Sequence, residues 1–219
     1  MIQIPTNLPD WKKAKYQMVQ SWQTLNQTCR KGQTVFTGSS LMEMFPVENF
    51  AREEGDAFPI LYNRGVGGFT THDMLRCLDE MVIGLQPRRV FINIGTNDLS
   101  DGSVTIADLI GRYRQILTTI LADVPGVEIN LMAYYPINYE AAAESMKACL
   151  RIRTNERIAD ANRAVAALAE EIHLRFIDVS APLKDDQGRL KAEYTIEGMH
   201  IYEAGYRAIW PLVKEEILK

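Results

Sequence analysis

The chain reads Val35-Phe36-Thr37-Gly38-Ser39-Ser40 at the point where an apolar run ends and a helical pattern starts. The short run from Thr34 to Thr37, rich in β-branched residues, is typical of a buried strand. Gly38 allows a sharp turn after that strand. The turn would place the Ser40 hydroxyl at the start of a helix, where backbone N–H groups stabilise anions. Helix capping by Ser39 or Ser40 is the competing interpretation.

Further apolar runs follow along the chain, separated by helical patterns. Strands are expected over residues 59–63, 89–94, 127–132 and 174–179, and helices over residues 71–85, 106–121, 152–172 and 204–218. The helical stretches carry apolar residues every three or four positions. Alternating strands and helices predict a parallel sheet covered on both faces, with the site beyond the carboxyl ends of the strands. Without an internal repeat or linker, we expect a single domain over residues 1–219.

An N-terminal helical extension, residues 1–31, is expected to pack on this domain. Its helix should run from about Asp10 to Arg30, with a near-heptad stripe of Trp11, Met18, Trp22, Leu25 and Cys29. Such a stripe suits packing across the sheet or against the last helix. A dimer contact is the first alternative, and a membrane-surface role is the second, because a few lysines accompany the stripe.

Composition excludes several classes of function. The 219 residues are 47% hydrophobic and 24% charged, with a net charge of −4 and a pI of about 5.5. This balance does not indicate nucleic acid as a partner. No apolar stretch is long enough to span a bilayer, and the N-terminus lacks the pattern of a secretory signal. The three cysteines are widely spaced, which argues against disulfides or a zinc site and predicts a cytoplasmic protein.

Three more motifs follow the predicted strands or precede the last helix. They are Asn63-Arg64-Gly65-Val66-Gly67-Gly68, Ile94-Gly95-Thr96-Asn97-Asp98 and Glu197-Gly198-Met199-His200. A hydroxyl, a glycine corner, an exposed amide and a histidine beside an acid are the groups that acyl transfer requires. Taken alone, Gly68 suits an ordinary turn and Asn97 a turn or helix cap. Their joint occurrence predicts a serine hydrolase. Met42 stands where the α/β-hydrolase elbow needs its second glycine, which argues against that fold.

Gly38-Ser39-Ser40, Gly68, Gly95-Thr96-Asn97-Asp98 and His200 resemble, in this order, the sequence blocks of the SGNH (GDSL-type) hydrolase family. The resemblance extends from about Val35 to Tyr206. The run from Asn63 to Thr71 is most similar to the branch that contains the catalytic subunits of platelet-activating-factor acetylhydrolase. The resemblance implies a flavodoxin-like three-layer α/β/α fold with a five-stranded parallel sheet. It also implies hydrolysis of esters or thioesters through an acyl-enzyme, without a metal or cofactor.

The resemblance also implies roles for individual residues. Ser40 would be the nucleophile and His200 the general base. The oxyanion hole would be formed by the backbone N–H groups of Ser40 and Gly68 and by the side-chain amide of Asn97. Glu197 stands where the family usually has Asp, and we expect it to orient His200. Alternatively, a backbone carbonyl orients the histidine in a Ser-His dyad, or Asp185 or Asp186 reaches in.

Three further residues are expected to line the substrate pocket. Phe69 lies beside Gly68 at a position where a polar residue is common in the family, and His72 follows the same glycine corner. Tyr135 falls in the loop after the fourth strand, where core packing and simple surface exposure are the competing roles. The remaining histidine, His173, is expected to be structural.

Together these features predict an intracellular serine esterase that acts on small or short acyl groups. Candidate substrates are an acetylated sugar, a lipid or another short-acyl ester, and a homodimer is possible. Two alternatives stay open. The same site could serve an acyltransferase or thioesterase, or the chain could be a non-catalytic binding protein of the same fold.

Overall fold

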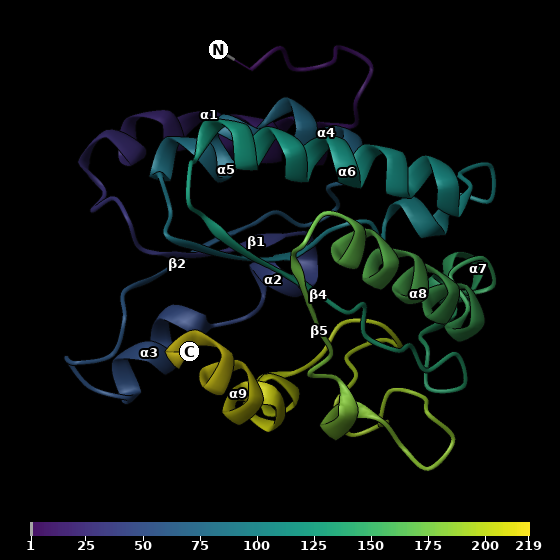
Figure 1. The fold of residues 1–219 in the computed structure, drawn as a ribbon. Coiled ribbons are helices and arrows are strands. Elements are labelled where there is room, and N and C mark those ends of the chain that lie inside the picture. Colours follow the sequence, from purple (N-terminus) through teal and green to yellow (C-terminus); the bar gives the residue numbers. More distant parts are fainter. Residues whose placement is uncertain (1) are drawn as a thin grey trace. The chain divides into compact units, whose positions relative to one another are not determined.

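The computed structural model describes residues 2–219 and contains a five-stranded parallel sheet of order β2-β1-β3-β4-β5. The strands are β1 (Thr34–Gly38), β2 (Leu61–Gly65), β3 (Arg89–Asn93), β4 (Glu128–Met132) and β5 (Arg175–Ile177). This is the strand order of flavodoxin-like sheets. With helices on both faces, the structure confirms the predicted three-layer α/β/α class (Figure 1).

Helices connect the strands. They are α1 (Asp10–Thr28), α2 (Ser40–Glu43), α3 (Val47–Glu53), α4 (Thr71–Arg76), α5 (Leu78–Met81), α6 (Ile106–Asp123), α7 (Glu144–Leu150), α8 (Asn155–Glu171) and α9 (Glu203–Leu218), with 3-10 turns η1 (Ile83–Leu85), η2 (Asp98–Ser100) and η3 (Ala181–Leu183). The single helix expected over residues 71–85 is wrong. It breaks at the fully buried Cys77, whose φ of −118° and ψ of 15° are not helical. Neither α3 nor α7 was expected.

Contacts divide the chain into two compact units. The first comprises Met1–Ile94 and Gly111–Ile129. In it, α1, α4 and α5 lie on one face of β2, β1 and β3, and α3 lies on the other (Figure 1). The carboxyl ends of the three strands are in register, because Gly38 pairs with both Gly65 and Asn93. Within this core, Phe36 stacks on Phe91 with ring centroids 4.6 Å apart.

The second unit comprises Gly95–Ile110 and Asn130–Lys219. Its part of β4 pairs with β5, from Asn130 opposite Arg175 to Met132 opposite Ile177. Here α8 packs on β5, and α9 packs on η3. The apolar faces predicted for these two helices are buried, which confirms both amphipathic patterns. Buried members are Ile158, Ala161, Val165 and Leu168 on α8, and Tyr206, Ile209, Trp210, Val213 and Ile217 on α9.

Helix α1 buries a different face from the one its heptad stripe indicates. Tyr16, Val19 and Asn26 are buried, whereas Trp11 and Leu25 are 56% and 52% exposed. The helix packs on α5 and η1. Part of this buried face is polar: beside Tyr16 and Val19, the Asn26 amide donates to the Glu80 carbonyl over 2.8 Å. A pattern based on hydrophobicity alone misses such a face.

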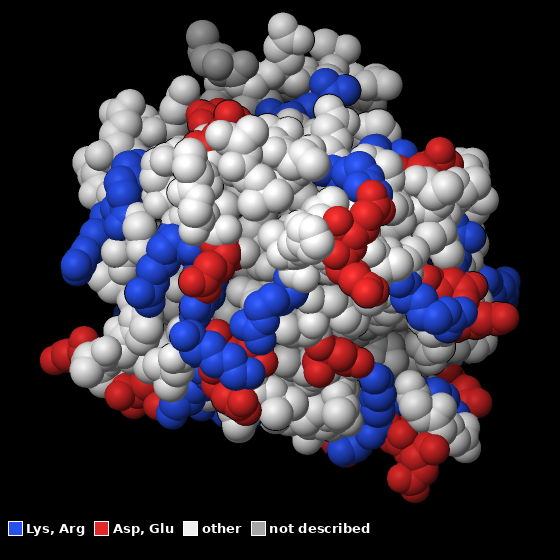
Figure 2. All heavy atoms as spheres, viewed as in Figure 1, with Lys and Arg blue, Asp and Glu red and all other residues white. Residues whose placement is uncertain are grey.

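The surface carries charges of both signs. On the face seen in Figure 2, Lys and Arg side chains alternate with Asp and Glu, without a large field of one sign. That mixture agrees with the small net charge of −4. Within residues 2–219, every helix is too short or too polar to cross a membrane.

Candidate active site

The nucleophile corner, residues 38–40, joins β1 to α2. Gly38 has a φ of +147°, and a Cβ there would lie 1.9 Å from the Asn93 carbonyl oxygen. Only glycine therefore fits, and the next N–H, that of Ser39, donates to the same oxygen over 3.1 Å. Ser40 is the first residue of α2 and is half-buried. Ser39 occupies the N-cap position, but its side chain makes no capping bond, so the capping interpretation is wrong for Ser39.

The glycine corner, residues 65–70, follows β2 and is tied to the nucleophile corner through backbone and amide bonds. The Val66 N–H donates to the Gly38 carbonyl over 2.9 Å. The Asn63 side chain donates to the Met42 carbonyl over 2.7 Å and accepts from the Gly65 N–H over 2.8 Å. One amide thus holds the end of β2 against the segment that carries Ser40.

Two features restrict position 68 to glycine: its backbone φ and the Trp11 ring of α1. Its φ of +78° lies in the left-handed region that favours glycine. A Cβ at this position would lie 2.6 Å from the Trp11 indole. Trp11 therefore forms the surface directly beside Gly68. In the sequence, Trp11 belongs to a heptad stripe, and no local signal connects it with a corner 57 residues away.

Helix α1 also anchors the chain just after Gly68. Thr70 caps α4, and the Asp73 carboxylate accepts from the Thr70 N–H over 2.8 Å. The same carboxylate accepts from Lys12 over 2.7 Å and from the Tyr16 hydroxyl over 2.6 Å. Burial alone would raise the pKa of Asp73, but the bonds from Lys12, Tyr16 and Thr70 outweigh it and lower that pKa. The glycine corner is thus fixed by an ionised, fully bonded carboxylate.

The three residues expected to line the pocket have different surroundings. Phe69 is fully buried, with its ring 5.0 Å from that of Tyr16. Tyr135 is 3% exposed, and burial raises its pKa. Burial of both rings argues against the expected lining role, because neither presents a surface to a ligand. His72 is exposed on the first turn of α4, beside the glycine corner.

Asn97 precedes η2 and is half-buried. Its side chain makes no capping bond, so the helix-cap alternative is wrong. Instead, Oδ1 accepts a hydrogen bond from Arg153 Nη2 over 2.9 Å. A guanidinium only donates, so this contact fixes which end of the amide faces Arg153. Arg153 gave no signal in the sequence, because it lies 56 residues from Asn97 and outside every motif.

The histidine loop, residues 195–201, brings Glu197 to His200. Thr195 and Ile201 form an antiparallel bridge, and the Ile196 N–H donates to the His200 carbonyl over 2.8 Å. Across this closed loop, Glu197 Oε1 lies 2.5 Å from His200 Nδ1. The longer side chain of Glu therefore reaches the imidazole.

Burial of Glu197 would raise the pKa of its carboxyl, but the bonds to His200 outweigh burial and lower that pKa. An ionised carboxylate therefore faces the histidine. The alternative acid Asp185 is bonded elsewhere, with Oδ2 accepting from Arg189 Nε over 2.9 Å.

The remaining histidine, His173, lies apart in the chain from the proposed site segments. His173 is exposed at the end of α8, with a φ of +56°. Among residues 2–219, no three His, Cys, Asp or Glu side chains gather closely enough to hold a metal ion.

Known proteins are similar to this chain in sequence and in fold. The pattern of the GDSL-like lipase/acylhydrolase family matches residues 38–208. A Streptococcus pneumonia structure, described provisionally as a platelet activating factor, is 29% identical over 95% of each chain with a TM-score of 0.84. A GDSL-like lipase from Bacteroides thetaiotaomicron is 23% identical, covering 91% of this chain and 97% of its own, with a TM-score of 0.75.

A catalytic mutant of an acetylxylan esterase from Geobacillus stearothermophilus is similar in fold, with 17% identity and a TM-score of 0.63. The match covers 86% of this chain and 95% of the esterase. No curated protein matches the sequence. The two structures below 25% identity bear on the fold alone.

Proposed function

The chain belongs to the GDSL-like lipase/acylhydrolase family, and we propose that it hydrolyses esters of small acyl groups through an acyl-enzyme on Ser40. Membership makes it a carboxylic ester hydrolase. The observation that carries the proposed mechanism is the 2.5 Å contact between Glu197 Oε1 and His200 Nδ1. A carboxylate at Nδ1 favours the tautomer whose Nε2 accepts a proton, which is the form that a general base requires.

In the first half of the reaction, the Ser40 oxygen attacks the acyl carbon while His200 takes the Ser40 proton. The tetrahedral intermediate collapses, and the same proton passes to the leaving alcohol. Glu197 stabilises the imidazolium that forms in between. In the second half, His200 takes a proton from water as the water attacks the acyl-enzyme. That proton returns to Ser40 as the acid leaves.

The negative oxygen of each intermediate would be held by the backbone N–H groups of Ser40 and Gly68 and by the Asn97 amide. Each such donor contributes on the order of 3 kcal/mol to the transition state. The local geometry of each residue supports this role. Gly38 and Gly68 allow close approach of the backbone, and Asn97 Oδ1 accepts from Arg153, so the bond from Arg153 fixes the orientation of the amide plane.

A small acyl group is the substrate class that the family branch favours. The Trp11 indole beside Gly68 adds an apolar surface to that side of the corner. Acetylated sugars and short-acyl lipids both fit this description. The three cysteines form no disulfide, and we place the enzyme in the reducing cytoplasm.

A panel of 4-nitrophenyl esters from acetyl to decanoyl tests this proposal. We expect the highest kcat/KM for acetyl, with a steady fall as the chain lengthens, and no turnover by Ser40→Ala. Activity retained by Ser40→Ala would overturn the mechanism. A preference for long chains would overturn only the substrate class. Transfer to added alcohols in place of hydrolysis, or faster turnover of acyl-thioesters, would favour an acyltransferase or thioesterase.

A further inference from the structure

Arg153, in the connection between α7 and α8, contacts two parts of the proposed catalytic machinery. Its side chain is almost entirely inside the protein, with 3% of the residue exposed. Nη2 donates to Asn97 Oδ1 over 2.9 Å, and Nε donates to Ser100 Oγ over 2.8 Å. Nη1 contacts the sulfur of Met199, the residue before His200. One guanidinium therefore joins the Asn97 segment to the histidine loop.

The partners of this cation are unusual for a buried charge. Buried guanidinium groups normally pair with carboxylates, because an uncompensated charge is costly to bury. Among the described residues, the hydrogen bonds of Arg153 go to an amide, a hydroxyl and a thioether, which are all neutral. Burial lowers the pKa of Arg153 to about 10, against the raising influence of Cys149, Asp98 and Glu197. The group therefore stays protonated at neutral pH.

A cation bonded to the oxygen of an amide changes what the amide nitrogen can do. The bond holds the amide plane in one orientation, with Nδ2 directed away from the guanidinium. It also draws electron density toward Oδ1, so the N–H bonds become more polar and donate more strongly. Both effects favour an oxyanion donor, which works best when it is preorganised and aimed before the charge develops.

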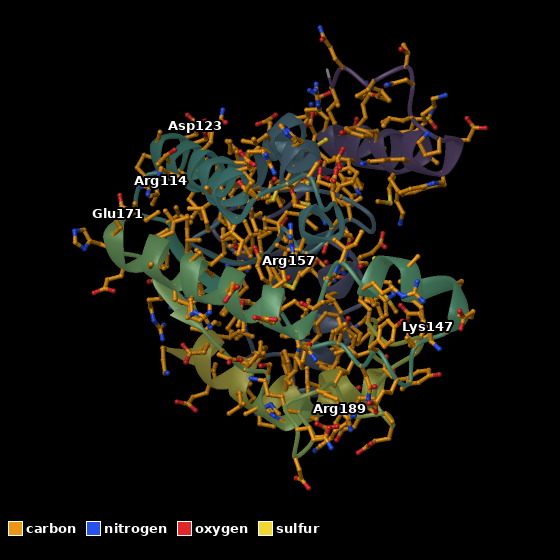
Figure 3. All side chains as sticks on the ribbon, turned by 90° about the vertical axis from the view of Figure 1, so that its right-hand side faces the viewer. Arg114, Asp123, Lys147, Arg157, Glu171 and Arg189 are labelled. Atoms are coloured by element: carbon orange, nitrogen blue, oxygen red, sulfur yellow. The ribbon has the colours of Figure 1, made fainter. Side chains whose placement is uncertain are left out.

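A second arginine nearby has a purely structural set of contacts. Arg157, labelled on α8 in Figure 3, donates to the carbonyls of Val104 and Asp101 over 2.5 and 3.3 Å. Arg157 thus holds the far end of the segment that Asn97 begins, without touching the Asn97 amide. The two arginines offer a matched pair, since one contacts the proposed donor and the other only the backbone.

We propose that Arg153 is a positioning residue of the oxyanion hole, which orients and polarises the Asn97 amide. This proposal rests on the proposed role of Asn97 as an oxyanion donor. Arg153 acts through Asn97, so its contribution exists only while the amide is present.

A double-mutant cycle between Arg153 and Asn97 tests this dependence. Arg153→Met keeps the volume and removes the charge and the donors. Rates are divided by the fraction of folded enzyme, measured by circular dichroism, so misfolded protein does not count. We expect Arg153→Met to lower kcat about 30-fold with KM changed less than about twofold. In an Asn97→Ala background, the same change should lower kcat less than about threefold.

Two controls define the background. Arg151→Met removes an exposed arginine of the same connection and should leave kcat unchanged. Arg157→Met should lower the melting temperature. Any effect of this change on kcat should be the same with and without the Asn97 amide. If Arg153→Met does not fold, Arg153→Lys completes the same cycle. Lysine keeps the charge but cannot reach all three acceptors, so a loss between those of wild type and Met is expected.

The outcomes separate this inference from the proposed function. If Arg153→Met lowers kcat equally with and without the Asn97 amide, the positioning role is overturned. Arg153 would then contribute only through packing. A normal kcat for Arg153→Met beside a reduced kcat for Asn97→Ala would overturn this inference alone. An unchanged kcat for Asn97→Ala would overturn both, because there would be no donor to position.

Discussion

The segments that carry Ser40 and Gly68 are held differently from those that carry Asn97 and His200. Around Ser40 and Gly68, glycines permit contacts that a Cβ would block, and the Trp11 ring lies against the corner. Around Asn97 and His200, charged side chains make the decisive contacts, with Arg153 on the amide and Glu197 on the imidazole. At Ser40 and Gly68 themselves the arrangement depends on shape, with the charged Asp73 anchoring the chain just after Gly68. At Asn97 and His200 it depends on charged groups that contact the two side chains directly.

This difference predicts how substitutions in each pair of segments should impair activity. A substitution at a glycine of the first pair should displace backbone and change geometry. A substitution in the second pair should leave the backbone in place and remove polarisation or proton transfer.

The largest effect is expected at the histidine loop. His200→Ala should lower kcat about 10⁴-fold, because the general base is lost. Glu197→Gln should lower kcat nearly as much, since the amide no longer provides a charge for the imidazolium. Steady-state kinetics with 4-nitrophenyl acetate measures both. A loss below about tenfold for Glu197→Gln would instead favour a Ser-His dyad in which another group orients the ring.

At the glycine corner, the expected effect is smaller and geometric. Gly68→Ala should lower kcat about 100-fold, because the new methyl group meets Trp11 and the donor N–H moves. Adding Trp11→Ala should restore part of that activity by giving the methyl group room. The strained φ of +78° persists in the double variant, so recovery should be incomplete.

Gly126 provides a matched control for this prediction. It has a similar φ of +81°, but no atom lies within 4 Å of its would-be Cβ. Gly126→Ala should cost about 1 kcal/mol of stability and leave kcat unchanged. If Gly68→Ala behaves like Gly126→Ala, the corner does not supply an oxyanion donor.

The smallest effect on activity is expected at Asp73, which acts mainly on stability. Asp73→Asn should lower the free energy of unfolding at pH 7 by about 2 kcal/mol, because Lys12 loses its partner. The folded-state pKa of Asp73 is depressed, so its contribution is complete above the ordinary value of 3.8 and is lost as the pH falls further. Urea unfolding should therefore show the two proteins converging below about pH 4.

Asp10→Asn serves as the control, because Asp10 is fully exposed on α1, the helix that carries Lys12. Its unfolding curve should follow that of the wild type at every pH. A constant gap between wild type and Asp73→Asn from pH 7 to pH 3 would contradict the ion-pair account.

The features that the sequence predicted correctly are the strands, turns and helix starts that neighbouring residues determine. The run from Val35 to Ser40 contains its own strand, its own turn residue and its own helix start, and the structure has all three. Strand boundaries moved by one or two residues where flanking apolar residues extend beyond the ladder, as at Pro59 and Ile60 before β2.

The contacts that the sequence did not predict join residues that lie far apart in the chain. Arg153 carries no local mark of its contact with Asn97, and Trp11 carries none of its contact with Gly68. The buried face of α1 was also missed, in part because Tyr16 and Asn26 contact their neighbours through hydrogen bonds. Periodicity records how apolar residues repeat, and it says nothing about which polar group will find a partner.

Labelling with a fluorophosphonate tests the central claim most directly, because this probe reacts with a serine only when a base and an oxyanion hole activate it. The labelled protein is digested, and mass spectrometry locates the adduct. The account predicts one adduct on Ser40, none in Ser40→Ala and strongly slowed labelling in His200→Ala. Labelling at another residue, or no labelling of the wild-type protein, would contradict it.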